Sequence, residues 1–469
     1  MIERKTLIVI SAAAILTRII SLFLMSGNLH TDSVFEVLEP AHKITYGYGI
    51  LTWEYVYGIR SWFVPLLVAE VFRAGEMLKI TQINDLIFAV KLLASAASLA
   101  LLYVIYVFSK DLFGVRTAAY STIFAVFSPL LWAWSAETHP MIISTLYSTI
   151  SLYIFWLGAS RKSARLYLLS GLSLGVSFMF RFDTIIFMLP LLIFAICSGQ
   201  QRALSPFLMG VGVVLMLQGL LDYLTWGYFF HSPLESFTQQ IVHGKASFFG
   251  VQPPYYFIGV LGLHITCLFM LPYAMEKNKA TTFLAMNSIV ILVMYSLIPH
   301  KEARFIMPML PVFLILAGHG MEKAVDSLGS QFRYAILALT IISSTFITYD
   351  LVINSGQDKL AAMIYVGQQS DATGVAYNTP WGSSGGYTYL HKMIPAVYVS
   401  KTALGPALNT IKCGKPKMSL IGFQCSPWAD IPSESKINYL MVDRSIPVQV
   451  PSSFVMVKEF NGVLVYKRI

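Results

Sequence analysis

Residues 30–42 form a short polar run whose side chains are suited to acid–base chemistry. Its ionisable groups are three carboxylates and two imidazoles: Asp32, Glu36, Glu39, His30 and His42. The run follows directly on an apolar segment, residues 6–25, and charge at the mouth of a membrane helix is costly unless it is used or paired. A carboxylate placed there can accept a proton from a hydroxyl group. The alternative is a helix with one solvated, charged face, because the carboxylates recur at three- and four-residue steps.

A second polar cluster, His300-Lys301-Glu302-Ala303-Arg304, lies between two later apolar segments. Its cations His300, Lys301 and Arg304, together with backbone N–H groups at the start of a helix, could bind a phosphate. Lys301 and Glu302 could instead serve only to anchor a helix at the membrane surface. The topology given below places both clusters on one side of the membrane, which favours a shared catalytic cleft.

The composition indicates a helical protein that crosses the membrane many times. Of 469 residues, 56% are hydrophobic and 12% are charged, whereas soluble domains have about 25% charged residues. The net charge of +9 does not indicate a nucleic-acid partner, because the basic residues gather at the ends of apolar runs, as membrane topology requires. The expected partners are therefore membrane lipids and not nucleic acid.

Hydropathy predicts about eleven membrane-spanning helices, each near the roughly 20 residues that cross a hydrocarbon core. The predicted spans are residues 6–25, 86–108, 114–133, 140–158, 166–180, 184–198, 204–224, 255–274, 280–298, 305–320 and 332–350. A further apolar stretch, residues 61–80, carries charges at three-residue spacing on one face. We expect this stretch to lie along the membrane surface.

The distribution of Lys and Arg predicts a cytoplasmic N-terminus, because every loop that this topology places inside then contains basic residues. The opposite, outer face receives both polar clusters and a large first loop. It also receives further candidates for substrate binding: Trp53, Arg60, Glu137 and His139. An interfacial tryptophan is most often part of an aromatic belt, although its ring can also stack on a sugar.

After about residue 350 the sequence changes to short alternating segments with Gly and Ser turns, which predicts two domains. Residues 1–350 form the membrane domain, and residues 351–469 form a small α/β domain on the outer face. Strands are expected near 374–377, 396–400 and 438–442. Asn461-Gly462 between two apolar runs predicts a hairpin, because these residues tolerate the positive φ angles of a tight turn.

Two of the four cysteines, Cys413 and Cys425, fall in this outer domain. An oxidising compartment would favour a disulfide between them. A metal site is the alternative, but two thiols alone do not complete a tetrahedral ligand set.

Several longer motifs resemble the first outer loop of glycosyltransferase family 22, the lipid-dependent α-mannosyltransferases. They are His30-x-Asp32, Leu38-Glu39-x-Ala41-His42, Tyr46-Gly47-Tyr48-Gly49-x-Leu51-Thr52-Trp53-Glu54 and Gly58-Ile59-Arg60-Ser61. His300-Lys301-Glu302-x-Arg304-Phe305-x-x-Pro308 resembles a later motif of the same family and stands in the right order. The resemblance covers roughly residues 28–320 and does not extend into the outer domain.

The resemblance implies a GT-C fold and transfer of a sugar, with mannose expected, from a polyprenyl-phosphate donor to a lipid-linked or glycolipid acceptor. It implies inversion at the anomeric carbon and no metal or other cofactor. The acidic position of the family motif falls on Asp32, which becomes the candidate general base. Two departures, Thr31 for a proline and Ser33 for a second acid, leave the choice of acceptor open, and Glu36 stands where a glutamine is more usual.

The remaining candidates follow from position on the outer face. Substrate binding is assigned to Glu36, Glu39, His42, Trp53, Arg60, Glu137 and His139, and the donor phosphate to His300, Lys301 and Arg304. A GT-C transferase for another sugar or a protein acceptor is the alternative enzyme. A lipid or sugar transporter is less favoured, because the charge gathers on one face and not at mid-membrane. The short chain and the lack of an endoplasmic-reticulum retrieval signal favour a prokaryotic plasma membrane over the endoplasmic reticulum.

The topology predicts that Ser163 and Ser384 lie on opposite sides of the membrane. Single cysteines at these positions should react differently with an impermeant thiol reagent in intact cells, with Ser384→Cys labelled from outside and Ser163→Cys labelled only after permeabilisation. Labelling of both from the same side would contradict the topology and the shared cleft.

Overall fold

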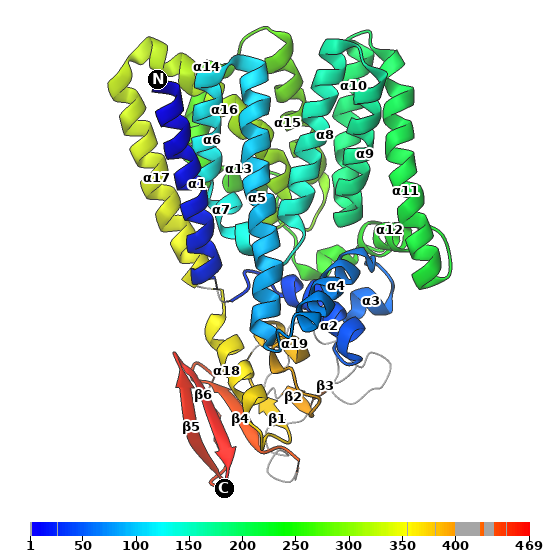
Figure 1. Cartoon of the computed structure of the whole chain (residues 1–469), viewed down its shortest axis with the longest axis vertical. Coiled ribbons are helices and arrows are strands. Elements are labelled where there is room, and N and C mark those ends of the chain that lie inside the picture. Colours follow the sequence, from blue (N-terminus) through cyan, green and yellow to red (C-terminus); the bar gives the residue numbers. More distant parts are fainter. Residues whose placement is uncertain are drawn as a thin grey trace. The chain divides into compact units, whose positions relative to one another are not determined.

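The computed structural model of the chain, shown in Figure 1, describes residues 2–25, 27–353, 355–379, 381–398, 423–425, 436–446 and 448–469. Packing divides the chain into two compact units. The first comprises the residues up to Leu24 together with Lys91–Leu351, and the second comprises Met25–Val90 together with Val352–Ile469. The sequence predicted a single boundary at residue 350, whereas the packing groups the large first loop with the C-terminal segment.

The first unit is a bundle of long helices that run side by side (Figure 1). Its main helices are α1 (Ile2–Leu24), α5 (Ile83–Phe113), α6 (Val115–Val126), α7 (Pro129–Ala133), α8 (Met141–Arg161), α9 (Ala164–Phe180), α10 (Met188–Cys197), α11 (Leu204–Trp226), α12 (His231–Phe237), α13 (Tyr256–Leu261), α14 (Ile265–Ala274), α15 (Lys279–Leu297), α16 (Leu310–Leu328) and α17 (Ser330–Ile353). Only the part of α5 from Lys91 onward belongs to this unit. Short 3-10 segments, among them η2 (Trp134–Ala136), η3 (Phe182–Phe187) and η8 (Ala303–Met309), connect them.

Eight helices among the described residues are long and apolar enough to cross a membrane, which corrects the prediction of about eleven. The segment 114–133 contains a break, since α6 ends at Val126 and Pro129 starts a new short helix. The segments 166–180 and 184–198 coincide with apolar helices, Ala164–Phe180 and Phe182–Cys197, that are shorter than 18 residues. Hydropathy counts apolar residues along the chain and does not detect where a helix ends. The chain is nevertheless a multi-pass membrane protein, as predicted.

Small residues allow α9 and α11 to pack closely. A Cβ atom on Gly171 of α9 would collide with the carbonyl oxygen of Phe207, and one on Gly210 of α11 would collide with that of Leu168. Helices in a bilayer gain little from apolar contact alone, so close backbone approach at small residues is a main source of their packing energy.

Arg18 shows how the bundle accommodates a charge within an apolar helix. Its side chain is 1% exposed. The guanidinium donates hydrogen bonds to Ser98 Oγ (3.1 Å) and to the carbonyl of Val126 (3.0 Å), which satisfies part of its hydrogen-bonding capacity inside the bundle.

The second unit contains helices from both of its chain segments. They are the π-helical turn η1 (Ser33–Leu38), α2 (Glu39–Tyr46), α3 (Trp53–Val56), α4 (Phe63–Met77), α18 (Gln357–Gln368) and α19 (Gly386–Leu390). The α4 helix corresponds to the stretch expected at the membrane surface. It is not among the eight candidate spans, and Glu70 and Arg73 on its charged side form an exposed ion pair.

A six-stranded mixed sheet in the order β3-β2-β1-β4-β6-β5 completes the second unit and confirms the predicted C-terminal sheet. The strands are β1 (Val375–Tyr377), β2 (Ala396–Tyr398), β3 (Phe423–Cys425), β4 (Tyr439–Asp443), β5 (Phe454–Phe460) and β6 (Val463–Arg468). The pairs β1–β2, β1–β4 and β2–β3 are parallel, and β6 is antiparallel to β4 and β5. The predicted hairpin is present, with Asn461 at φ 37° and Gly462 at φ 96°. The predicted disulfide involves Cys413, which lies outside the described residues.

One apolar core joins the two segments of the second unit. Leu38 and Phe72 from the first loop pack in the same cluster as Met363 of α18 and Tyr377 and Met441 of the sheet. This shared core is the reason that residues 25–90 belong with the C-terminal segment: the apolar side of η1, α2 and α4 is buried there.

Glu39, at the start of α2, connects the same two segments through hydrogen bonds. Its Oε2 accepts a hydrogen bond from the N–H of Ile50 at 2.7 Å, and its Oε1 accepts one from the N–H of Thr388. Burial raises the pKa of the carboxyl to about 7, although the two backbone donors act in the opposite direction. Gly386, at φ +59°, lies against this carboxyl, where a Cβ atom would collide with it.

We expect Glu39→Gln to lower the thermal unfolding midpoint of the detergent-solubilised chain. The substitution turns one acceptor oxygen into an NH₂ group that faces a backbone N–H, and a buried donor left without an acceptor costs about 1–3 kcal/mol. The matched control is Glu70→Gln, because Glu70 is 63% exposed and should leave the midpoint nearly unchanged. Equal midpoints for both variants would show that the hydrogen bonds to Glu39 do not stabilise the second unit.

Candidate active site

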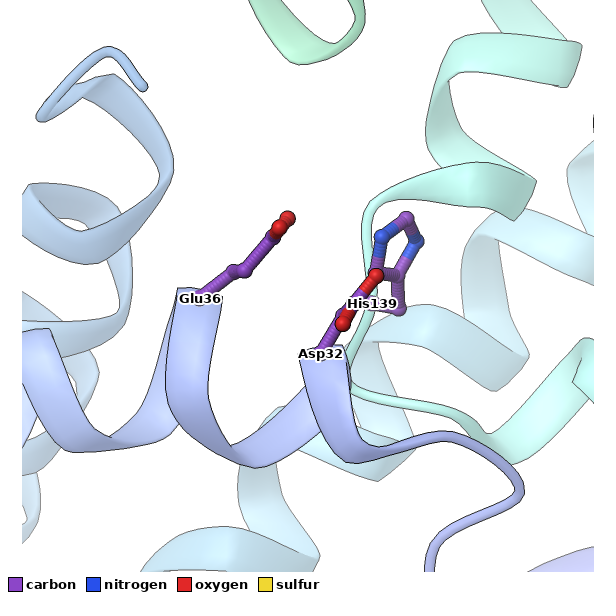
Figure 2. A group of neighbouring side chains, drawn as sticks. All are labelled: Asp32, Glu36 and His139. Atoms are coloured by element: carbon purple, nitrogen blue, oxygen red, sulfur yellow. The ribbon is translucent and has the colours of Figure 1, made fainter. Parts of the chain in front are cut away.

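A π-helical turn directs the carboxylates of Asp32 and Glu36 to the same side of the chain. Asp32 is the N-cap residue of η1, and Glu36 lies within it. A π-helix pairs residue i with residue i+5, so one turn takes up more than four residues, and such turns are frequent at functional sites. Figure 2 shows both carboxylates leaving the helix in the same direction, with oxygens within 4.8 Å of each other. The imidazole of His30 lies beside Asp32, with Nδ1 3.3 Å from Oδ1.

Arg60 forms a partly buried ion pair with Glu36. Arg60 Nη2 donates to Glu36 Oε1 at 2.7 Å, and the side chain of Glu36 is only 9% exposed. The hydroxyl of Tyr55 donates to the backbone carbonyl of Glu36, also at 2.7 Å. Both α3 and the segment that follows it therefore contact the π turn, and three of the predicted site residues, Asp32, Glu36 and Arg60, belong to one cluster.

Glu54 adds a third carboxyl group to this cluster, and it was not selected from the sequence as a site residue. Its Oε2 is buried and has no hydrogen-bond partner among the described residues. Burial, followed by repulsion from Glu36, raises the pKa of Glu54 to about 8, while Arg60 acts in the opposite direction and Asp32 adds to the repulsion. Burial alone would lower the pKa of Arg60, but attraction to Glu36 and Glu54 more than offsets it and raises the pKa. Arg60 is therefore held in its charged form, and the neutral form of the Glu54 carboxyl is favoured more than that of an exposed glutamate.

The sequence did contain a signal for Glu54. It ends the longest motif of the first loop, next to Trp53, but nothing in the one-dimensional pattern distinguishes it from other polar residues there. Its proximity to Glu36 and Arg60 arises only when α3 folds back on η1.

His42 and Trp53, two residues predicted to bind substrate, contact other parts of the second unit. His42 Nδ1 donates to the carbonyl of Tyr48 at 2.9 Å, so its Nε2 must accept from Nδ1 of His391 at 3.0 Å. Burial lowers the pKa of His42 to about 4, which keeps this chain of hydrogen bonds neutral on the His42 side. The ring of Trp53 lies edge-on to that of Tyr57 at 6.1 Å. Together with the backbone contacts of Glu39, these interactions are structural, and a substrate contact for any of the three stays a prediction.

The second polar cluster lies in the first unit and is organised around Glu302. His300 Nε2 lies 3.1 Å from Glu302 Oε1, and Arg304 Nε donates to Glu302 Oε2 at 2.6 Å. The bond to Glu302 raises the pKa of His300, and its Nδ1 donates to the carbonyl of Gly250 at 2.9 Å. Lys301 Nζ donates to the carbonyl of Gln252 at 2.9 Å. With His300 protonated, three cations and one carboxylate leave a net charge of +2 on this motif.

Aromatic rings and a second ion pair surround Arg304. Its guanidinium lies over the rings of Trp134 and Phe305, each 5.6 Å from the centroid. Phe305 is also contacted by the guanidinium of Arg181 at 5.5 Å. Arg181 forms a bidentate pair with Asp183 at 3.0 and 2.9 Å, so the cationic groups of this region are held in place by side chains from η3 and η8.

Glu137 and His139 are buried in the turn before α8. The carboxylate of Glu137 attracts the buried ammonium group of Lys91 on α5, which accounts for a lysine within an apolar span. The ring of His139 lies edge-on to Trp134 at 5.9 Å. The first unit thus holds Glu137, His139 and the His300–Arg304 motif, while Asp32 and its neighbours belong to the second unit. A cleft shared by the two clusters stays a prediction.

Solved structures show which class of fold this is. The chain has a TM-score of 0.65 and 12% identity with ArnT from Cupriavidus metallidurans bound to undecaprenyl phosphate, with 99% of this chain and 98% of that chain covered. It has a TM-score of 0.55 and 13% identity with the Archaeoglobus fulgidus oligosaccharyltransferase, with 92% and 68% covered. The chain therefore has the GT-C fold of membrane glycosyltransferases, as the sequence predicted.

The family follows from the sequence comparison. A sequence profile described as the Alg9-like mannosyltransferase family matches residues 9–391, well over half of the chain. The chain belongs to this family. The match includes both polar clusters, in agreement with their motifs. It also extends to residue 391, beyond the residues 28–320 that the motifs indicated and into the predicted outer domain.

Curated relatives are GPI mannosyltransferases. The chain is 26% identical over 321 residues to GPI mannosyltransferase 3 of Drosophila melanogaster, a match that covers 65% of this chain but only 55% of that protein. It is 23% identical over 476 residues to GPI alpha-1,2-mannosyltransferase 3 of Homo sapiens, with 96% of this chain and 81% of that protein covered. The alignments thus cover only part of each relative's length, little more than half in the case of the Drosophila protein.

The raised pKa of Glu54 predicts a pH-dependent difference between the chain and its Glu54→Gln variant. A carboxyl whose pKa rises from 4.5 to about 8 on folding stabilises the folded chain fully below pH 4.5, and this contribution is lost as the pH rises through about 8. The loss is up to ~1.4 kcal/mol per pH unit for one proton. Glutamine resembles the neutral acid, so the Glu54→Gln variant should not lose this stability as the pH rises.

The measurement is the unfolding midpoint of variant minus parent at about pH 6 and about pH 9, where the difference should grow with pH. Glu70→Gln serves as the control without such a trend, because Glu70 is exposed. A difference that stays constant across this range would show that Glu54 is already ionised at neutral pH.

Proposed function

We propose that this protein transfers mannose from a polyprenyl-phosphate donor to a hydroxyl group of a lipid-linked or glycolipid acceptor. The observation that carries the proposal is the position of Asp32. It is the acidic residue of the family motif, it opens a π turn, and the neighbouring carboxylate of Glu36 is already paired with Arg60. Mannose as the sugar, and a glycolipid as the acceptor, are supported by the names of the relatives.

Asp32 acts as the general base in this proposal. Its carboxylate accepts the proton of the acceptor hydroxyl while the hydroxyl oxygen attacks the anomeric carbon. The bond from that carbon to the phosphate oxygen breaks, and the polyprenyl phosphate leaves with the bonding electrons. A single displacement of this kind inverts the anomeric carbon. No metal is required by this sequence of events, because phosphate is a good leaving group and cationic side chains can stabilise its charge.

The donor phosphate is assigned to His300, Lys301 and Arg304. Glu302 neutralises one of their three charges and fixes the orientation of His300 and Arg304. Preorganised cations of this kind bind a phosphate without reorganising during the reaction. The site is assigned to the outer or lumenal face of the membrane.

We expect Asp32→Asn to reduce the transfer rate at least ~100-fold, the low end for general acid–base catalysis, because an amide is a poor proton acceptor. Transfer of radiolabelled mannose from polyprenyl-phosphate mannose to extracted membrane glycolipids would measure this. Asp358→Asn on α18, outside the cluster, is the matched control and should keep the parental rate.

Glu36→Gln keeps a hydrogen bond to Arg60 and should do less harm than Asp32→Asn. Near-normal turnover of Asp32→Asn, with chemistry as the slow step, would exclude Asp32 as the base. Donor binding that stays intact in an inactive Asp32→Asn variant would support the division between base and phosphate site.

A further inference from the structure

The connection between α11 and α13 exposes an apolar face on a segment that does not span the membrane. It contains α12, η5 (Thr238–Val242) and η6 (Lys245–Phe249). Leu234, Phe237 and Ile241, at three- and four-residue spacing, are 59%, 58% and 46% exposed. Further exposed apolar residues of the same segment are Val242, Phe248, Phe249 and Val251.

The inner side of the same segment is polar. Ser232 is fully buried and Gln239 is 8% exposed. Asp222 of α11, itself buried, accepts hydrogen bonds from the N–H of Ser232 at 3.0 Å, from its hydroxyl at 2.7 Å and from Gln218 at 2.9 Å. A helix on a water-facing surface buries its apolar face and exposes its polar one. Here the order is reversed, so the outer face suits an apolar surrounding.

The ends of the segment indicate which apolar surrounding this is. Both neighbouring elements, Gln201–Trp226 and Tyr256–Ala274, are candidate membrane spans, so the connection starts and ends where the chain leaves the hydrocarbon. Figure 1 shows α12 at the end of α11. Trp226 and Tyr255 stand at these two points, as is common at a membrane–water interface.

We propose that residues 231–251 lie within the interface of the bilayer, with Leu234, Phe237 and Ile241 in contact with membrane lipid. Asp222 fixes the segment to the end of α11, and its exposed apolar residues enter the acyl boundary. The partner is bulk bilayer lipid and not a protein surface.

This placement has a consequence for the second polar cluster. The carbonyl of Gly250 accepts from His300, the carbonyl of Gln252 accepts from Lys301, and the N–H of Gln252 donates to the carbonyl of Pro299 at 3.0 Å. A segment seated in the interface therefore holds His300 and Lys301 at the depth of lipid phosphates. The lipid contact does not depend on the proposed activity. Only the suggestion that His300 and Lys301 meet a donor phosphate rests on that activity.

Spin labelling of the full-length protein in lipid vesicles tests the lipid contact. Phe237→Cys and Ile241→Cys are made in a chain whose four natural cysteines are replaced by alanine, labelled with a nitroxide and reconstituted into phosphatidylcholine–phosphatidylglycerol vesicles. Collisions with oxygen, which concentrates in lipid, are compared with collisions with a water-soluble nickel chelate. Ile342→Cys on α17 is the lipid-facing control, since Ile342 is 68% exposed within a candidate span. Ser445→Cys, exposed beyond β4, is the water-facing control.

We expect both labels to follow Ile342, with high oxygen and low nickel accessibility. High nickel accessibility, as at Ser445, would place the face in water. Low accessibility to both reagents would show that protein covers it, and either result overturns the proposal. Two labelled positions keep the test valid if one variant fails to fold, which its gel-filtration profile reveals. Near-normal turnover of Asp32→Asn would exclude Asp32 as the base without changing these accessibilities, so the two proposals fail separately.

Discussion

The cost of burying charge in apolar surroundings is the constraint on which both units depend. Arg18 is tolerated within a span because Ser98 and the carbonyl of Val126 accept its hydrogen bonds. Lys91 is tolerated because Glu137 lies near it. In the second unit, the buried carboxyl of Glu39 is satisfied by backbone donors from both chain segments, so the same interaction that removes the cost also joins them.

The same constraint sets the charge state of the candidate active site. Three carboxylates share a single guanidinium, and Arg60 pairs directly with Glu36. Burial of its Oε2 atom, followed by repulsion from Glu36, raises the pKa of Glu54, and a proton on this carboxyl reduces the repulsion within the cluster. The π turn contributes the geometry, because it directs Asp32 and Glu36 to one side.

The same cost of placing polar groups in apolar surroundings applies to the connection after α11. There the polar side chains turn inward to Asp222 and the apolar ones turn outward, which is the arrangement that a lipid surrounding favours. Since the end of this connection also holds His300 and Lys301 through backbone carbonyls, the membrane itself helps to set the level of the cationic motif.

Local patterns of residues are sufficient to identify the class of protein, the positions of its motifs and part of its secondary structure. Apolar content and the spacing of basic residues identify a multi-pass membrane protein, and Asn461-Gly462 determines a hairpin, because these properties depend on residues close together in the chain. The motif of Asp32 likewise pointed to the family. The tertiary structure decided the rest. Glu39 finds its second donor 349 positions away, Glu54 becomes a proton site only beside Glu36, and three predicted spans prove too short or interrupted. The burial of these residues and the identity of their partners depend on segments that are distant in sequence, so they cannot be inferred from a local pattern of residues.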